Sequence, residues 1–410
     1  MADTAAHLVD RVIPVVPVRQ WVLSLPYGLR YRLAYDAGMV TAVLGVFVRA
    51  VFGHLRRRAA EYGIEQAQCG AVTFVQRFGG SLNCNVHYHA LMLDGVYAPK
   101  ADGDPEFFAL RPPETSEVRR IVGTIAQRVS AMLKRRESKE GSEDGEDSDK
   151  LVRKDPWLAG VYAASVTGRI ATGPQAGRRV ATGGDRIDPE GLSVLTTERC
   201  ARESGFSLHA NVAVPARDRA RLERLIRYMA RPPLATERLE MLPDGRLVYE
   251  FKRAWRDGTS RAVYTPLELI EKLVPLVPKP RAHLTRYSGV LAPAAKWRNA
   301  VIPVVAAESV VKPVGAETCT AEVTTDNDTK EQAALAPPSR HPRNYPWAEL
   351  MRRVFAFDVL ACECGGRMRI VSAIHPPETT RKILDCLGLP SRAPPVAPAI
   401  PEQTLDSAWL

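Results

Sequence analysis

Two histidines separated by one residue, His87 and His89, are the side chains of this chain whose spacing most clearly suggests chemistry. They lie in the segment 86–95, whose residues predict a β-strand. Because alternate residues of a strand point to the same face of a sheet, both imidazoles are expected to leave that face side by side. Two neutral imidazoles placed in this way can hold one divalent cation. The alternative is that the pair only fills a polar patch on the sheet.

A second reactive group is the phenol of Tyr228, in the segment 218–230, which is predicted to be a helix ended by Pro232. Apolar residues at helical spacing give this helix one stripe for packing, and Tyr228 lies at the edge of that stripe. Its ring can therefore be packed while its hydroxyl reaches a cleft. Arg224, four residues before it, and Arg231, three residues after it, lie within side-chain reach on a helix.

A tyrosine between guanidinium groups is suited to attack on a phosphodiester. Cations favour the phenolate, which is the nucleophilic form, and guanidinium groups also bind phosphate oxygens. Such an attack leaves a covalent phosphotyrosine intermediate. The alternative interpretation of the same helix is a half-buried tyrosine beside solvated arginines.

The composition favours a globular protein with a polyanionic partner. The chain has 410 residues, with 56 Lys and Arg against 46 Asp and Glu, a formal net charge of +10. An excess of positive charge of this kind most often serves to bind nucleic acid. Seven scattered cysteines do not resemble a secreted disulfide framework and indicate a reducing cytoplasm. No signal peptide is evident, and the apolar run 37–48 is too short to span a bilayer, so no membrane partner is expected.

The elements that must position these groups follow from the hydrophobic patterns. The first part predicts a strand at 20–25, a helix at 31–62 and a strand at 71–76 before the histidine strand, an order of strand, helix, strand, strand. Later segments predict a strand at 206–214 before the tyrosine helix, a strand at 246–251 and a helix opened by Thr265-Pro266. Five aromatic residues are candidates for stacking on unpaired bases, although core packing is expected for most: Trp21, Phe78, Tyr88, Trp255 and Trp297.

Taken together, five segments resemble the HUH rolling-circle transposases of bacterial insertion sequences, within the two-tyrosine transposase group. The segments are Arg19–Pro26, Gln76–Asn83, Asn85–Gly95, Arg227–Ala235 and Pro280–Val290. The resemblance covers 12–100 and 205–303, and more loosely 340–390.

The resemblance implies an α+β fold, in which helices pack on one side of a central antiparallel sheet whose middle strand carries the histidine pair. It implies a nuclease domain in two halves, with a small C-terminal α/β unit. The expected division is 1–100 for the first half, 101–205 for an insertion with a disordered acidic run, and 206–305 for the second half. A linker at 306–343 and a C-terminal domain with a Pro-rich tail at 344–410 complete it.

The resemblance also implies a reaction, the nicking and transfer of single-stranded DNA at element ends and target. Tyr228 would become linked to the 5′ phosphate, leaving a free 3′ hydroxyl, and His87 and His89 would ligate Mg²⁺ or Mn²⁺. Gln76 is the favoured third ligand, with His209 as its rival and cross-strand hydrogen bonding as the alternative role of Gln76. The DNA contacts are expected from arginines, namely Arg224, Arg227, Arg231, Arg281 and Arg286.

The chain departs from the pattern of that group at two points. Pro232 stands where two-tyrosine members carry a second tyrosine, which indicates the single-tyrosine, ISCR-like branch; Tyr264 and Tyr287 are the other candidates for a second tyrosine. No zinc-binding module precedes Val12 in this sequence, so we expect the chain to lack it. The competing hypotheses are a related relaxase or replication initiator, and a non-catalytic DNA-binding remnant of a mobile element. Under each of these hypotheses, a cytoplasmic, nucleoid-associated bacterial protein is expected.

Overall fold

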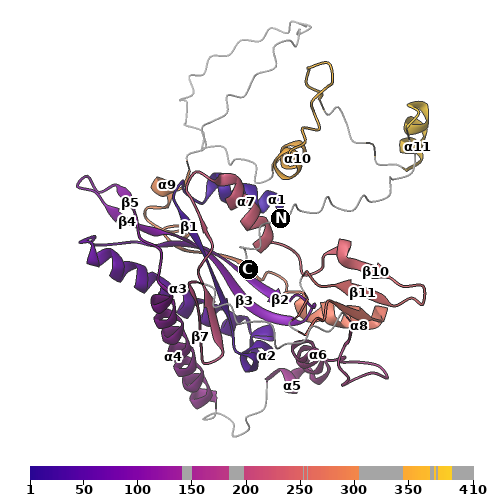
Figure 1. The fold of residues 1–410 in the computed structure, drawn as a ribbon, viewed down its shortest axis with the longest axis horizontal. Helices are drawn as coiled ribbons and strands as arrows, with labels where there is room; N and C mark the ends of the chain where they lie inside the picture. The colour runs from indigo at the N-terminus through magenta and orange to yellow at the C-terminus, as the bar shows by residue number, and fades with distance from the viewer. Residues whose placement is uncertain are drawn as a thin grey trace, which may run out of the picture.

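The computed structural model describes residues 1–140, 150–183, 198–252, 254–255, 257–303, 345–369, 374 and 377–389. It has an α+β fold in which helices pack around antiparallel sheets (Figure 1). Most of the predicted acidic run, all of the predicted linker and most of the Pro-rich tail lie outside the described residues.

The main sheet is antiparallel and has seven strands. Six of them follow the order β13-β2-β3-β1-β8-β7, and β9 pairs with β1, so that the histidine strand β3 is central. Their bounds are Val18–Ser24 (β1), Gly70–Phe78 (β2), Cys84–Leu93 (β3), Cys200–Glu203 (β7), Phe206–His209 (β8), Ala213–Val214 (β9) and Thr285–Gly289 (β13). The expected strand, helix, strand, strand order is present in β1, α2 (Tyr27–Tyr35), α3 (Ala37–Glu61), β2 and β3.

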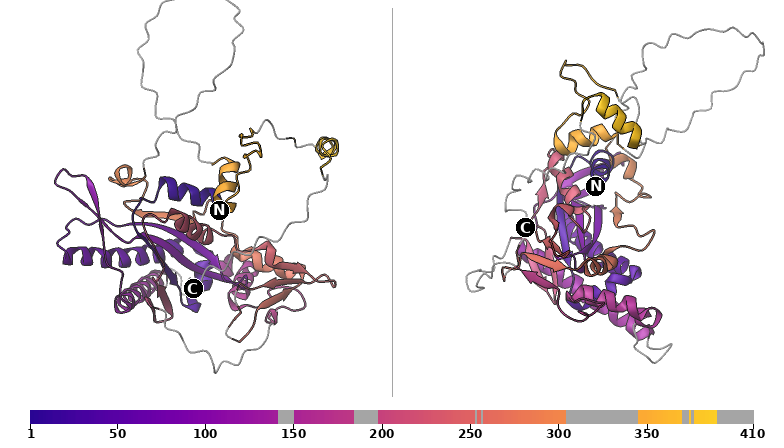
Figure 2. Two further views of the ribbon diagram at one scale, coloured as in Figure 1. Left: turned by 45° about the horizontal axis from the view of Figure 1, so that its top comes forward. Right: turned by 90° about the vertical axis from the view of Figure 1, so that its right-hand side faces the viewer.

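Helices cover both faces of this sheet, so the expectation of helices on one side was wrong. One face packs against α1 (Ala2–Arg11) and α7 (Arg219–Met229), and the other against α3 and α4 (Thr115–Glu140). Figure 2 shows the two layers in further views. The helix missing from the expectation is α1, which precedes the first predicted strand and buries Leu8 and Val9 against the sheet.

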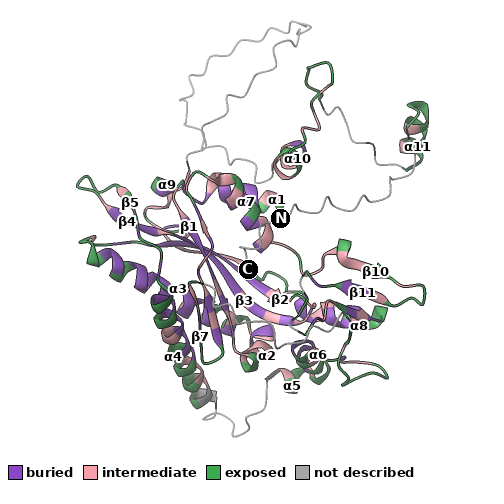
Figure 3. Cartoon of the chain, in the orientation of Figure 1, coloured by how far each residue is buried: buried purple, intermediate pink, exposed green. Residues whose placement is uncertain are grey.

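The strands of the sheet centre are buried on both faces (Figure 3). This two-sided burial fits the apolar run Ala90–Leu93 at the end of β3, whereas Asn85 and His87 alternate with fully buried residues at its start. The helix α3 is the single described helix long and apolar enough to cross a membrane, and it is mostly buried inside the fold. Helix α3 is therefore a core helix. It extends from Ala37 to Glu61, well beyond the apolar run 37–48.

The segment predicted as an insertion supplies parts of the main body. Helix α4 packs on α3 and β7, and β7 forms one edge of the main sheet. The same segment contains β5 (Pro105–Ala109), which pairs with β4 (Gly95–Pro99) just before the segment. It also contains α5 (Lys150–Lys154), α6 (Pro156–Thr167) and β6 (Ala181–Gly183). The division of the chain into domains stays a prediction.

A second, four-stranded sheet has the order β10-β11-β12-β6. The bounds of its remaining strands are Leu239–Met241 (β10), Leu247–Glu250 (β11) and Arg261–Tyr264 (β12). Tyr264 donates from its hydroxyl to the Ser81 carbonyl at 3.1 Å, which ties β12 to the turn between β2 and β3. Helix α8 (Pro266–Leu273) follows, and Thr265 and Glu268 form the capping box that starts it.

Short helices complete the fold: the 3-10 helices η2 (Thr236–Arg238) and η3 (Val274–Leu276), then α9 (Arg298–Val301), α10 (Trp347–Phe355) and α11 (Pro377–Cys386). Helix α10 docks on α1 through Arg353, which donates two hydrogen bonds to the carboxylate of Asp10 at 2.6 and 2.7 Å. This ion pair holds the pKa of Asp10 below its usual value, against the opposing effect of burial.

Candidate active site

The structure places the two histidines and the tyrosine together on one face of the sheet. The rings of His87 and His89 have centroids 5.0 Å apart, and the ring of Tyr228 meets that of His89 edge-on at 6.4 Å. Tyr228 meets His89 because α7 packs on the face of the sheet to which His87 and His89 both point. Asp218 begins the helix by accepting from the Arg221 amide at 3.0 Å, and Leu222 and Ile226 bury its inner side.

Gln76 anchors the end of the tyrosine helix to the sheet. Its side-chain amide donates to the carbonyl of Met229, next to Tyr228, at 2.7 Å. Gln76 is also the cross-strand partner of His87, and its side chain is buried. The end of α7 is therefore fixed relative to the histidine pair by one side chain, and the carbonyl oxygen of that amide remains for another partner.

Both histidines are held in the neutral form at neutral pH. The pKa of His87 is lowered to about 4, mainly by burial; the hydrogen bond to Asn85 opposes this shift, and the nearby Arg231 contributes to it. Burial also holds the pKa of His89 well below its usual value, with His87 and Arg231 adding to the effect. Neutral imidazole is the form that binds metal ions.

The hydrogen bonds of the pair orient its nitrogens. Nδ1 of His87 lies 2.8 Å from the Asn85 carbonyl, so Nδ1 carries the proton and Nε2 keeps its lone pair. Nδ1 of His89 lies 2.9 Å from the side-chain amide of Gln20. As placed, the amide N–H of Gln20 donates to Nδ1 of the neutral His89 ring, whose proton is then on Nε2. For Nε2 of His89 to hold a cation, the amide of Gln20 has to turn over so that its oxygen accepts from Nδ1–H. Gln20 was not recognised from the sequence, because its contact with His89 depends on the register between β1 and β3. The bond between His87 and the Asn85 carbonyl lies within β3 and was also missed.

The surroundings of the pair fit a divalent cation. Asn85 lies on the same face of β3 as the pair, and its Oδ1 is buried without a hydrogen-bond partner. A buried amide oxygen without a hydrogen-bond partner has lone pairs that could coordinate a cation. Among the described residues, no group of three or more His, Cys, Asp and Glu side chains could hold a metal. A further ligand at this pair would therefore be an amide oxygen, from Gln76 or Asn85, or a phosphate oxygen of a substrate.

His209, the rival for the third ligand, lies on the same face but farther away. Val22 is the cross-strand partner of both His89 and His209, so one strand separates them. Two strand spacings correspond to about 10 Å between backbones. Burial lowers the pKa of His209. The position of Gln76 directly opposite His87 makes it the nearer candidate.

Two cations lie against the tyrosine ring. The guanidinium carbon of Arg231 is 4.2 Å from the centroid of the Tyr228 ring, and the ammonium nitrogen of Lys252 is 4.9 Å from it. Arg231 was predicted from the sequence, whereas Lys252 was missed. Lys252 follows β11 and is far from Tyr228 in the sequence, so only the packing of the second sheet reveals it.

The other predicted arginines are distributed differently. Arg224 is exposed on α7, and Arg227 pairs with Glu223 at 3.0 Å. Arg281 is exposed in the loop before β13, with a left-handed backbone at φ 63°.

Arg286 lies on the opposite face of the sheet from the histidine pair. Its cross-strand partner is Thr73, which itself pairs with Ala90, and both belong to the face that α3 covers. The structure therefore brings Arg231 to the site and does not bring Arg286 there.

Neither candidate for a second tyrosine is placed beside the pair by a ring contact. Tyr264 is almost completely buried, and burial raises its pKa. Tyr287 is half-buried, with the guanidinium of Arg298 5.7 Å from its ring centroid.

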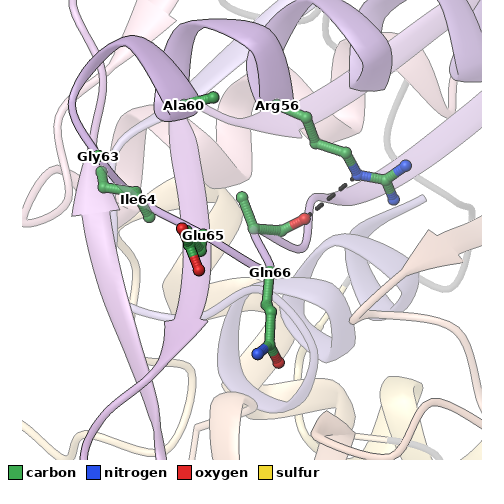
Figure 4. Close-up of a pocket in the computed structure, with 7 residues that line it drawn as sticks. Arg56, Ala60, Gly63, Ile64, Glu65 and Gln66 are labelled. Atoms are coloured by element: carbon green, nitrogen blue, oxygen red, sulfur yellow. Dashed lines mark hydrogen bonds between the residues drawn. The ribbon is translucent and has the colours of Figure 1, made fainter.

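A separate surface hollow lies where α3 ends and the chain turns toward β2 (Figure 4). Its lining is Arg56, Ala60, Gly63, Ile64, Glu65, Gln66 and Ala67, and Arg56 donates to the Ala67 carbonyl at 3.2 Å. None of the residues singled out for chemistry lines this hollow. The paired histidines, and not this hollow, are therefore the candidate site.

A family model named Y2_Tnp, described as "Putative transposase", matches residues 70–299, more than half of the chain. The chain belongs to this transposase family. The matched range includes β2, β3, α7 and β13, and so contains the histidine pair and Tyr228. Membership supports a role in DNA transposition, with DNA as the partner. No curated protein and no solved structure matches the chain.

Proposed function

We propose that this transposase nicks and rejoins single-stranded DNA by the HUH rolling-circle mechanism, with Tyr228 as the nucleophile. The observation that carries the proposal is the placement of the Tyr228 ring 6.4 Å from the His89 ring, on the same face as His87. A tyrosine used only for packing would not require two neutral, oriented imidazoles and a guanidinium around it. The proposal places the protein in the cytoplasm, where it meets bacterial DNA.

In the nicking step, the phenolate oxygen of Tyr228 bonds to the scissile phosphorus and the bond from phosphorus to the 3′ oxygen breaks. The phenol loses its proton, and the released 3′ oxygen ends as a hydroxyl. The product is a 5′-phosphotyrosine. Arg231 and Lys252, which flank the ring, are placed to attract the phosphate.

His87 and His89 would hold Mg²⁺ or Mn²⁺, with Gln76 contributing an amide oxygen. When bound there, the ion would polarise the scissile phosphate and hold it for in-line attack. The Asn85 carbonyl keeps the His87 imidazole in the orientation that offers Nε2. Gln20 would do the same for His89 with its amide oxygen, in place of its amide nitrogen, against Nδ1. Gln76 also fixes the end of α7, so one residue would couple the cation site to the nucleophile.

Strand transfer reverses the chemistry. The 3′ hydroxyl of an acceptor strand attacks the phosphotyrosine, its oxygen bonds to phosphorus, and the bond to Tyr228 breaks. The tyrosine takes up a proton and is ready for another cycle. Because Pro232 occupies the position of a second tyrosine, we infer that one tyrosine serves both steps.

The test is formation of a covalent adduct between the full-length protein and labelled single-stranded oligonucleotides from the element ends, with Mn²⁺ present. We expect an adduct that denaturing electrophoresis retains, and that disappears in Tyr228→Phe and in His87→Ala. The matched control is Tyr62→Phe, because Tyr62 is 59% exposed on the surface and is not part of the site. Binding without an adduct under any divalent cation would instead favour the non-catalytic DNA-binding remnant.

A further inference from the structure

We propose that Trp255 is a stacking platform for an unpaired base of the DNA strand that reaches Tyr228. The inference rests on the proposed function, because it adds to that site a contact with the substrate. The ligand is a base of single-stranded DNA, recognised through its aromatic face. The platform lies on the turn between β11 and β12, in the second sheet.

Exposure distinguishes Trp255 from the other aromatic candidates. Trp21 and Tyr88 are completely buried in the core, and Phe78 is buried beside them. Trp297 is half-buried against the apolar cluster under α1 and α7. Trp255 is 46% exposed, so it alone among the five presents a large part of its indole to solvent.

The indole of Trp255 is held in place from behind. The ring of Phe251 stacks on it, with centroids 5.2 Å apart and planes inclined by 24°, and Phe251 itself is buried. The hairpin is closed by hydrogen bonds from the Trp255 amide to the Thr259 carbonyl and from the Phe251 amide to the Ser260 carbonyl, each at 2.7 Å. A fixed aromatic ring with one face covered and the other open loses little freedom when a base stacks on it.

The platform is close to the proposed nucleophile. Lys252 precedes Trp255 by three residues, so the Cα atoms of the two residues are at most about 11 Å apart. The ammonium of Lys252 lies 4.9 Å from the Tyr228 ring centroid. The proposed path of the DNA strand therefore runs from Tyr228 past Lys252, which is placed to attract its backbone, toward the hairpin that carries Trp255. Stacking of this kind tolerates any base, because every base has an aromatic face.

The experiment measures binding of fluorescently labelled oligothymidine to the full-length protein, with EDTA present so that no cleavage occurs. We expect Trp255→Ala to weaken binding about tenfold, and Trp255→Phe to restore most of the affinity. Trp255→Leu, which keeps an apolar contact with Phe251, should behave as the alanine variant does. The matched control is Trp157→Ala, because Trp157 is 60% exposed on α6 and should bind as the unmodified protein does.

A second probe separates stacking from charge and from folding. An abasic oligonucleotide keeps the phosphates and lacks the bases, so Trp255→Ala should leave its affinity unchanged. Equal affinity of Trp255→Ala and the unmodified protein for oligothymidine would overturn the inference. So would an equal loss of affinity for the abasic strand. Binding is measured without cleavage and so does not depend on adduct formation. Failure of the adduct assay would count against the proposed function, whereas the binding data would still test the role of Trp255.

Discussion

The two faces of the main sheet differ in what their buried side chains do. Tyr88 lies between His87 and His89 in sequence, yet it points to the opposite face, where its hydroxyl donates to the Val40 carbonyl at 2.9 Å. That face is filled by apolar side chains of α3 and α4, which pack against β3. The face of the two histidines carries neutral polar groups, one of them an amide oxygen without a partner.

This difference indicates where stability and where chemistry reside. Buried polar groups without partners cost free energy, which a bound ligand can offset. The α3 face is filled mainly by apolar side chains and stabilises the fold through burial, although His54, Arg58 and Thr73 also have buried polar atoms without partners there. The α7 face has the composition of a site, because its polar groups converge on the end of one helix. The predictions below test this division by changing one face at a time.

The largest effect is expected from the double variant His87→Ala/His89→Ala. Adduct formation should fall by about 10³-fold or more, since a ligand set acts as a unit. The free energy of unfolding should change by less than about 1 kcal/mol, because the substitution removes polar groups that burial disfavours. Adduct yield and denaturant unfolding of the same preparation measure the two effects. A loss of stability large enough to explain the loss of activity would contradict the division.

The reverse result is expected on the other face from Phe47→Ala. Phe47 is completely buried, and its ring lies 6.3 Å from that of Tyr88. Removal of a buried phenylalanine side chain costs about 3–5 kcal/mol of stability. At a temperature where the variant is still folded, adduct formation per folded molecule should be unchanged. A comparable loss of nicking in folded protein would show that the two faces are not separable.

The sequence predicted the α7 face well in its local parts. Alternation along β3 placed His87 and His89 together, and helical spacing placed Tyr228 beside the apolar stripe. Contacts between distant elements were not accessible in this way. The bond from Gln76 to the Met229 carbonyl and the approach of Lys252 to Tyr228 depend on how α7 and the second sheet dock. No periodicity within either segment carries that information.

The elements that were missed in the fold are short or depend on strand pairing. Helix α1 was missed because it is short and its pattern is that of any amphipathic segment before a strand. The strand β7 is an edge strand of four residues, too short for its pattern to stand out. The DNA contact of Arg286 came from motif position alone and stays a prediction. Strand register, which turns Arg286 to the α3 face, is fixed only once β13 pairs with β2.

Gln76 tests whether one residue links the cation to the tyrosine helix. Gln76→Leu removes both the amide oxygen and the hydrogen bond to Met229, and should lower adduct formation about 10- to 100-fold. Gln76→Glu keeps an oxygen for the cation and loses the amide donor, so it should retain more activity than the leucine variant. Gln68→Leu is the matched control, because Gln68 is exposed. Equal activity of the leucine and glutamate variants would argue against a ligand role for Gln76.

The smallest effect concerns pH and belongs to the α3 face. The pKa of His54 is lowered from its usual value near 6.5 to about 4, mainly by burial; Glu117 opposes the shift and Arg58 contributes to it. Between these values the unfolded chain takes up a proton that the folded protein excludes. The stability contributed by neutral His54 is therefore present above pH 6.5 and is lost as the pH falls toward 4.

His54→Gln, which has no titrating ring, should show a shallower decline in unfolding free energy over that range than the unmodified protein. Denaturant unfolding at a series of pH values measures the difference in slope. Adduct formation at neutral pH should be the same in both proteins, because His54 lies on α3 and is not part of the site. Identical slopes would show that the proton on His54 does not distinguish the folded from the unfolded state. The decline would then have to come from other groups, such as the carboxylate of Glu117, which hydrogen bonds hold ionised.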